Sequence, residues 1–186
     1  VRAPGEYEIL GETRDDAAGE AFDKGARLMG LGYPGGFAIQ EAARSGRATR
    51  YALPRALKGD TLEFSFSGLK TAVLRLVEGE GDALSIPDAA ASLQAAIVDV
   101  LADRAVRAVR RTRGGALTLV GGVAANESLR ERLADECNRE GIRFATPEAA
   151  HSTDNAAMIA LPGSINLARG ERDDRSIEAR ANAPVS

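Results

Sequence analysis

The chain has 186 residues, 44% of them hydrophobic and 27% charged, which is enough for one globular domain with a sizeable core. Its net charge of −3 argues against a nucleic-acid-binding surface over the whole molecule, while leaving room for a local basic patch. A single cysteine excludes an internal disulfide framework and a cysteine-rich zinc site, and it fits a reducing cytosol.

No apolar run is long enough to span a membrane and no signal peptide is present, so we expect a cytoplasmic protein with no membrane association. The chain begins at Val1 without methionine and enters a strand-like run at 7–10 almost at once. We therefore expect a piece of a longer protein. A helix is expected to follow the run, with Thr13 as its N-cap and its end near Met29.

Three carboxylates of this first helix, Asp16, Glu20 and Asp23, are spaced to share one face. Like charges at this spacing oppose helix formation, but Lys24 can reach Glu20 and Arg27 can reach Asp23 one turn away. One interpretation is a salt-bridged, solvated helix start. The other is a strand-turn-helix corner whose carboxylates face a ligand.

Glycines and a proline follow the first helix at 30–36 and indicate a helix stop. The backbone at 34–36 is either a structural turn or a surface that lies directly against a ligand. A short helix is expected at 39–44. An irregular connection punctuated by proline is expected at 47–60.

Alternating apolar residues at 62–66 predict a half-buried strand that turns into a helix at Ser67. The hydroxyl groups and Lys70 at this turn suit a phosphate, and a plain helix cap explains them equally well. A loop is expected at 79–87.

The longest helix is expected at 88–113, where apolar residues recur at helical spacing. Arg104, Arg107 and Arg111 fall on one side of its last turns. Cations there complement the helix dipole, and the alternative interpretation is contact with an RNA backbone.

A buried strand is expected at 116–120, followed by a glycine turn at 121–126 and an amphipathic helix at 127–140 with Asn126 as its N-cap. Ligands bind open α/β sheets at the carboxyl ends of strands, so this turn is the strongest generic site signal in the chain. Cys137 is interpreted as a small, partly buried side chain rather than a reactive thiol.

Another strand is expected at 142–146, and a helix is expected to start at 151–160 with Ser152 or Thr153 as its cap. Asp154 in its first turn either complements the dipole or binds a metal, which requires further ligands that His151 alone does not supply. The helix is expected to break at 161–163. The alternation of strands and helices predicts an α/β fold.

Five stretches together resemble one family. They are DDAAGEAFDK within 11–24, YPGG at 33–36, FSFSGLKT at 64–71, GGVAAN at 121–126 and TDNAAMI at 153–159. In this order they resemble the tRNA adenosine threonylcarbamoyltransferase family, known in bacteria as TsaD and formerly described as a glycoprotease. The resemblance covers about residues 7–160 and only the second part of a family member.

The resemblance implies an actin-like, Hsp70-like ATPase fold of the ribonuclease H-like type. Residues 1–169 would be most of its C-terminal lobe, lacking the upstream N-terminal part. The charged composition from Gly170 on, poor in large apolar residues, separately predicts a mobile tail at 170–186. The implied reaction moves a threonylcarbamoyl group from threonylcarbamoyl-AMP to N6 of the adenosine beside the anticodon in tRNAs reading ANN codons. The implied partners are tRNA, an inactive paralogue (TsaB-like), an ATPase (TsaE-like) and the enzyme that makes the adenylate.

Motif positions imply four site residues. Asp23 would hydrogen-bond the nucleotide ribose, Gly36 would lie against the same ligand, and Asn126 would contact the adenylate. Asp154 would bind the active-site metal, a divalent iron or zinc ion, which would polarise the carbamoyl end for attack by the tRNA amine.

This sequence also departs from the family pattern. The upstream His-x-x-x-His metal motif and the Ser-Gly-Gly-His loop are absent, so we expect an incomplete metal site and no activity from this chain alone. Phe37 stands where proline is usual, Gln40 where a ligand-contacting aspartate is common, and Ala56 replaces a proline.

Two alternatives remain open beside a fragment of an active transferase. Gln40 and the interrupted helix at 161–163 motivate a non-catalytic relative that acts as a scaffold or partner subunit. A kinase or ATPase of the same fold would need an upstream phosphate loop and a catalytic carboxylate. A protease finds no support, because neither His-Glu-x-x-His nor a nucleophile triad is visible.

Overall fold

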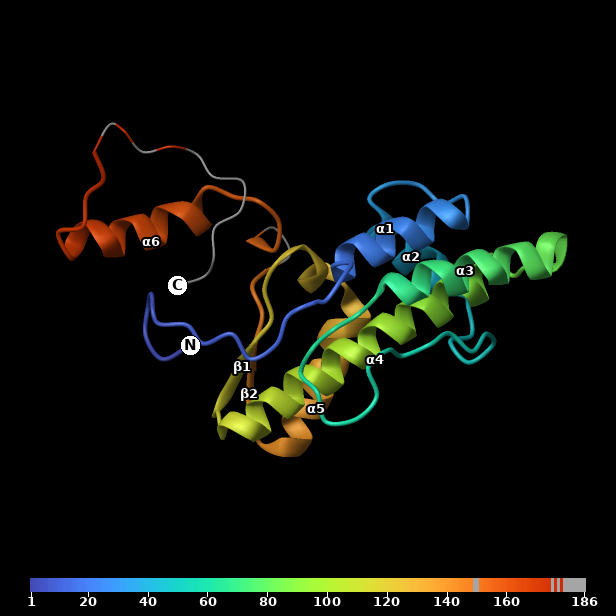
Figure 1. Cartoon of the computed structure of the whole chain (residues 1–186), viewed down its shortest axis with the longest axis horizontal. Coiled ribbons are helices and arrows are strands. Elements are labelled where there is room, and N and C mark those ends of the chain that lie inside the picture. Colours follow the sequence, from blue (N-terminus) through green and yellow to red (C-terminus); the bar gives the residue numbers. More distant parts are fainter. Residues whose placement is uncertain (149–150, 175, 177, 179–186) are drawn as a thin grey trace.

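The computed structural model describes residues 1–148, 151–174, 176 and 178, and the part described is mostly helical. Six α-helices, two 3₁₀ turns and two short strands follow one another along these residues (Figure 1). They are α1 (Ala18–Leu28), α2 (Gly35–Ala43), α3 (Ser67–Glu80), η1 (Gly81–Ala83), α4 (Ile86–Thr112), β1 (Ala116–Thr118), η2 (Gly122–Ala125), α5 (Glu127–Glu140), β2 (Arg143–Ala145) and α6 (Ala157–Ala168). None of the described helices is both long and apolar enough to cross a membrane.

Helix α4 is the centre of the packing. On one side its apolar residues join a core cluster with α1, α2 and α3, in which Phe22, Ile39, Leu93 and Ile97 are almost completely buried. Farther along, α4 packs on α5 and the strands through a second, smaller cluster. The long α4 therefore links a helical end of the molecule to the sheet end (Figure 1).

The described strands are shorter and fewer than the sequence predicted. β1 and β2 pair in parallel, with Leu117 opposite Phe144, and both strands show an exposed, intermediate, exposed pattern. The prediction of a buried strand at 116–120 is therefore wrong in both length and burial. The predicted strand at 7–10 is absent from the described chain, and 62–66 is reduced to one parallel bridge between Thr13 and Phe64. The predicted α/β class is thus confirmed only as helices around a small parallel sheet.

The first helix starts later than predicted. Thr13 is not its N-cap, because α1 begins at Ala18, and the Thr13 hydroxyl donates to the carbonyl of Asp16 at 2.7 Å instead. Asp16 consequently precedes the helix and does not share its face. Lys24 nevertheless bridges Asp16 at 2.7 Å and Glu20 at 2.8 Å, and these hydrogen bonds, the one with Asp16 first, raise the lysine pKa.

The helix α3 is capped by a residue distant in sequence, Asp15. Its carboxylate accepts hydrogen bonds from the backbone N–H groups of Phe66 and Ser67, at 2.7 and 3.0 Å, and from the hydroxyls of Ser65 and Ser67. A carboxylate of the protein already accepts these donors at the helix start, which favours the helix-cap interpretation of the turn over the phosphate one.

The arginines at the end of α4 hold a neighbouring segment of the chain. Arg104 is buried and donates to the carbonyls of Ala56, Leu57 and Glu63. Arg107 donates to Gly59 O at 2.6 Å, and Arg111 donates to Asp60 O at 3.1 Å. All three thus share one side, as predicted, but they order the irregular connection before α3, a role that neither interpretation anticipated.

Other helix boundaries match the sequence signals to different degrees. α5 has the predicted bounds, with Asn126 as N-cap and Gly141 in the left-handed region at φ 67°. α4 starts two residues before the predicted Asp88, because Ser85 caps it. α2 starts at Gly35, ahead of the predicted 39–44, and α3 with η1 extends into the predicted loop at 79–87.

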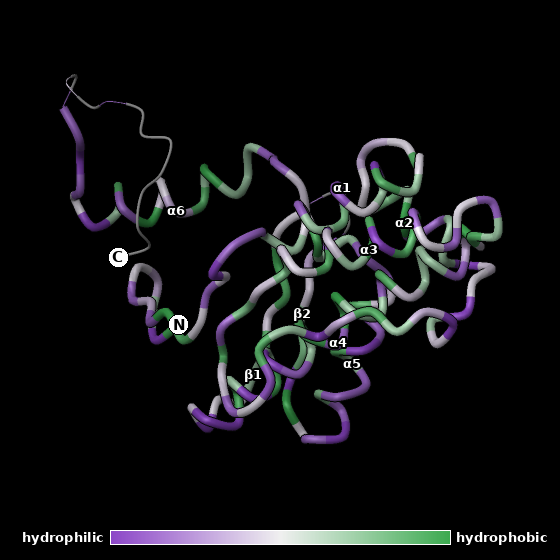
Figure 2. Tube along the Cα trace, turned by 45° about the vertical axis from the view of Figure 1, so that its right-hand side comes forward, coloured by the Kyte–Doolittle hydropathy of each residue, from purple (hydrophilic) through white to green (hydrophobic). Residues whose placement is uncertain are grey.

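The last helix differs most from prediction. α6 begins at Ala157, where the Asn155 side chain accepts the N–H of Met158, so Ser152 and Thr153 are not its caps. It also continues through Pro162 instead of breaking there. Proline lacks the N–H for one hydrogen bond of the helix, and the remaining bonds carry the helix on. α6 has no buried residue, and this helix, which carries apolar residues, lies apart from the other helices (Figure 2). Most of the predicted tail at 170–186 lies outside the described residues.

Candidate functional site

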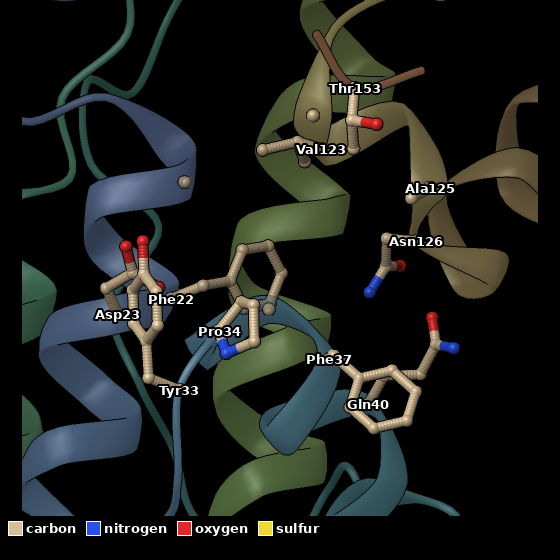
Figure 3. A pocket seen from close by; sticks show the side chains of 13 residues that line it. Phe22, Asp23, Tyr33, Pro34, Phe37, Gln40, Val123, Ala125, Asn126 and Thr153 are labelled. Atoms are coloured by element: carbon tan, nitrogen blue, oxygen red, sulfur yellow. The ribbon is translucent and has the colours of Figure 1, made fainter. Parts of the chain in front are cut away.

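A pocket of about 480 Å³ lies where α1, α2 and the η2–α5 turn meet. This volume is within the ordinary range for small-molecule sites. Figure 3 shows Asp23 on one side of it and Gln40 and Asn126 on the other. The lining residues are Gly19, Phe22, Asp23, Tyr33, Pro34, Gly36, Phe37, Gln40, Gly122, Val123, Ala125, Asn126 and Thr153. Three of the four predicted site residues therefore share one pocket.

Asp23 connects α1 to the start of α2. Its Oδ1 accepts the backbone N–H of Gly35 at 2.8 Å, which is a first-turn donor of α2. Within the described residues, its second carboxylate oxygen has no hydrogen-bond or ion-pair partner, and the expected pair with Arg27 is not formed. Asp23 therefore holds the α2 start through one oxygen, while its second oxygen is unpaired among the described residues.

The two glycines at the start of α2 have different reasons to be glycine. A Cβ on Gly35 would lie 2.5 Å from the Cα of Asp23, so the close contact between α1 and α2 requires glycine. A Cβ on Gly36 would meet no atom within 4 Å, and Gly36 lines the pocket. Gly35 therefore has a packing role, whereas the backbone at Gly36 lies open in the lining of the pocket.

Asn126 is a buried N-cap, as predicted. Its Oδ1 accepts the N–H of Leu129 at 3.0 Å, and its Nδ2 donates to Gln94 Oε1 at 2.9 Å. Only 7% of its surface is exposed. The amide is thus held in one orientation by α4 and α5, and this orientation fixes which atoms it can offer to the pocket.

Gln40, the departure from the family pattern, has a structural partner. Its Oε1 accepts the N–H of Glu127 at 2.8 Å, so a residue of α2 satisfies an N-terminal donor of α5. Arg44 also pairs with Glu127, at 3.5 Å. The α2 and α5 sides of the pocket are therefore tied directly to each other.

Asp154 does not line the pocket, although its neighbour Thr153 does. Asp154 and His151 are both exposed, and the described residues contain no group of three or more histidine, cysteine or acidic side chains able to hold a metal ion. A single carboxylate does not fit an iron or zinc ion, which needs several ligands. The described part of the chain therefore does not supply a complete metal site by itself.

Sequence reasoning misses the aromatic lining of the pocket. Phe22 is buried in the core behind the pocket. Tyr33, in the turn before α2, is 85% exposed, and Phe37, in the first turns of α2, is 65% exposed. In the sequence Phe37 stands out only as a replacement of proline, and a predicted helix start at 39 leaves it outside the helix. Cys137 is completely buried, more than predicted, and this burial raises the pKa of its thiol.

The pocket between α1, α2 and the start of α5 is bounded by two helix N-termini and a glycine turn, a setting in which small-molecule sites are common. Residues 1–161 match the family described as TsaD, tRNA N6-adenosine threonylcarbamoyltransferase, and the chain belongs to this family.

Curated relatives with the name tRNA N6-adenosine threonylcarbamoyltransferase are similar along most of the chain. The relative from Methylibium petroleiphilum is 49% identical over 194 aligned residues, and the one from Thermomicrobium roseum is 45% identical over 207; both alignments cover 100% of this chain and 56% of the relative. The relative from Desulfitobacterium hafniense is 52% identical over 163 residues, covering 86% of this chain and 48% of the relative. The chain thus spans about half the length of these relatives.

Proposed function

We propose that the full-length protein transfers a threonylcarbamoyl group from threonylcarbamoyl-AMP to N6 of the adenosine beside the anticodon in tRNAs reading ANN codons. One observation carries the proposal. Asp23, Gly36 and Asn126, selected from motif positions in three separate stretches, all line the same pocket in a chain of this family. A pocket with one acceptor carboxylate, an amide and open glycine backbone suits a ribonucleotide, whose hydroxyl groups donate and whose flat base needs close approach.

In this proposal residues 1–169 are most of the C-terminal lobe of an actin-like, Hsp70-like ATPase fold, and the rest of the protein completes the active site. The whole protein acts in the cytoplasm with tRNA, a TsaB-like paralogue and a TsaE-like ATPase. Membership of the TsaD family supports each of these points.

The pocket test uses Asp23→Asn in the full-length protein. The asparagine keeps one oxygen to accept the N–H of Gly35. Its second position is an NH2 group, which cannot accept a hydrogen bond from a ribose hydroxyl. We expect AMP affinity in calorimetry to fall about tenfold, which corresponds to about 1.4 kcal/mol, with little change in melting temperature. Unchanged affinity would remove Asp23 from the nucleotide site.

The same proteins test the activity in a threonylcarbamoylation assay with tRNA and the adenylate. Wild-type transfer supports the proposed function. Wild-type AMP binding without transfer, in the presence of the partner subunits, would instead support the non-catalytic scaffold.

Asp154 is proposed as one ligand of a metal ion whose other ligands come from outside the described residues. We expect Asp154→Ala to lower the metal content of the purified full-length protein, measured by elemental analysis. Asp135→Asn, at an exposed position of α5, is the control. A metal content equal to that of the wild type would show that the metal assignment is wrong.

A further inference from the structure

Arg130, on α5, connects three segments that are far apart in sequence. Its Nε donates to the carbonyl of Ala124 in η2, and its Nη2 donates to Pro147 O and to Ser152 Oγ, each at 3.1 Å. The guanidinium is a rigid planar fork, so one side chain can fix several acceptors relative to one another. No motif or spacing in the sequence points to this residue.

The segment after β2 depends on this side chain. Strand pairing of β2 ends at Ala145. From 146 to 156, the hydrogen bonds among described residues are local, such as His151 N–H to Glu148 O at 2.9 Å, except for the two from Arg130. Ser152, which receives one of them, is 3% exposed, whereas its neighbours Thr153 and Asp154 are exposed. Ser152 is thus the buried anchor of an otherwise exposed turn.

Both ends of the Arg130 contacts adjoin the pocket. Arg130 donates to Ala124, and the next two residues, Ala125 and Asn126, line the pocket. It also donates to Ser152, and the next residue, Thr153, lines the same pocket. The distance between the η2 wall and the turn at 152–154 is therefore set through one guanidinium.

We propose that Arg130 is a positioning residue, which holds the turn carrying Thr153 and Asp154 against the η2 wall of the nucleotide pocket. This inference rests on the proposed function for its effect on the reaction, but the positioning itself is testable without activity. Lysine is a poor substitute, because its ammonium is a single point charge and cannot reach three acceptors in a fixed plane.

The test compares Arg130→Ala and Arg130→Lys with Arg132→Ala in the full-length protein. Arg132 is the matched control: it lies on the same helix and forms surface pairs with Asp99 at 3.1 Å and Glu136 at 3.0 Å. We expect hydrogen exchange at 151–156 to accelerate in both Arg130 variants and to stay at the wild-type rate in Arg132→Ala. Wild-type protection of 151–156 in Arg130→Ala would overturn the proposal.

Measuring kcat and AMP affinity separately distinguishes a positioning role of Arg130 from a general loss of folded structure. A displacement of about 1 Å at a reacting centre can cost about 100-fold in rate, so we expect kcat to fall by about that factor in Arg130→Ala, with AMP affinity changing less than about fivefold. Added guanidinium should restore part of the kcat. Equal losses of kcat and AMP affinity, with a large drop in melting temperature, would contradict a positioning role. If the wild-type protein transfers nothing, the proposed function fails, and the exchange experiment still decides the role of Arg130.

Discussion

Replacing Gly36 by leucine is expected to lower the affinity for AMP at least about 100-fold while leaving the full-length protein folded. A side chain at Gly36 meets no atom within 4 Å of its Cβ and extends from a residue that lines the pocket. Leucine is a good helix former in the first turn of α2, so the helix itself is not weakened. The 100-fold loss corresponds to about 2.7 kcal/mol of binding free energy, measured by calorimetry.

Substitution of the adjacent Gly35 should instead affect the stability of the fold. Gly35→Ala places a Cβ 2.5 Å from the Cα of Asp23 and 2.8 Å from its backbone nitrogen, neither of which can move without separating α1 from α2. We expect this smaller substitution to cost about 1–3 kcal/mol of unfolding free energy in urea titrations. Full AMP affinity in Gly36→Leu would show that the ligand does not approach α2, whatever the outcome at Gly35.

Removing the Asp15 carboxylate is expected to destabilise the protein by about 2 kcal/mol at pH 7. The carboxylate caps α3 through two backbone N–H groups and two hydroxyls, and loss of a strong N-cap costs up to about 2 kcal/mol. Asp15→Ala should show this loss in urea unfolding. Asp135→Asn, at an exposed position on α5, is the control and should unfold as the wild type does.

The effect of Asp15 should depend on pH in a defined direction. Desolvation raises the pKa of its carboxyl group, but the hydrogen bonds from Ser65, Phe66 and Ser67 together lower it more, so the pKa lies well below the usual 3.8. A depressed folded-state pKa gives stability that is fully present above the unfolded value and is lost as the pH falls through 3.8 and below. The stability difference between wild type and Asp15→Asn should therefore shrink between pH 6 and pH 3. A constant difference over this range would contradict the cap.

The sequence predicts the bounds of a helix well when the residues that cap it are its direct neighbours in the chain. α5 has Asn126 before it and Gly141 after it, and both are recognisable because capping depends on neighbours in sequence. The starts of α1 and α3 cannot be predicted in the same way. Thr13 has the residue type of a cap but bonds its own turn, while the real partner of the α3 start is Asp15.

The predicted strands are longer than the observed ones because a pattern of apolar residues indicates only which side chains a segment can bury. It does not reveal whether a partner strand is present. Within the described residues β1 and β2 have only each other, and 62–66 has a single bridge to Thr13. Hydrogen bonding between distant segments decides strand length, and composition does not carry that information.

The sequence by itself determined the family and the pocket residues Asp23, Gly36 and Asn126, because these residues belong to contiguous motifs. Only the tertiary structure decided that these residues share one pocket, that Gly35 is required for packing, and that Arg130 donates to Ser152 in the turn that carries Asp154. The physical reason is that motifs record local chemistry, whereas caps, close contacts and guanidinium bridges join residues whose proximity exists only after the chain has folded.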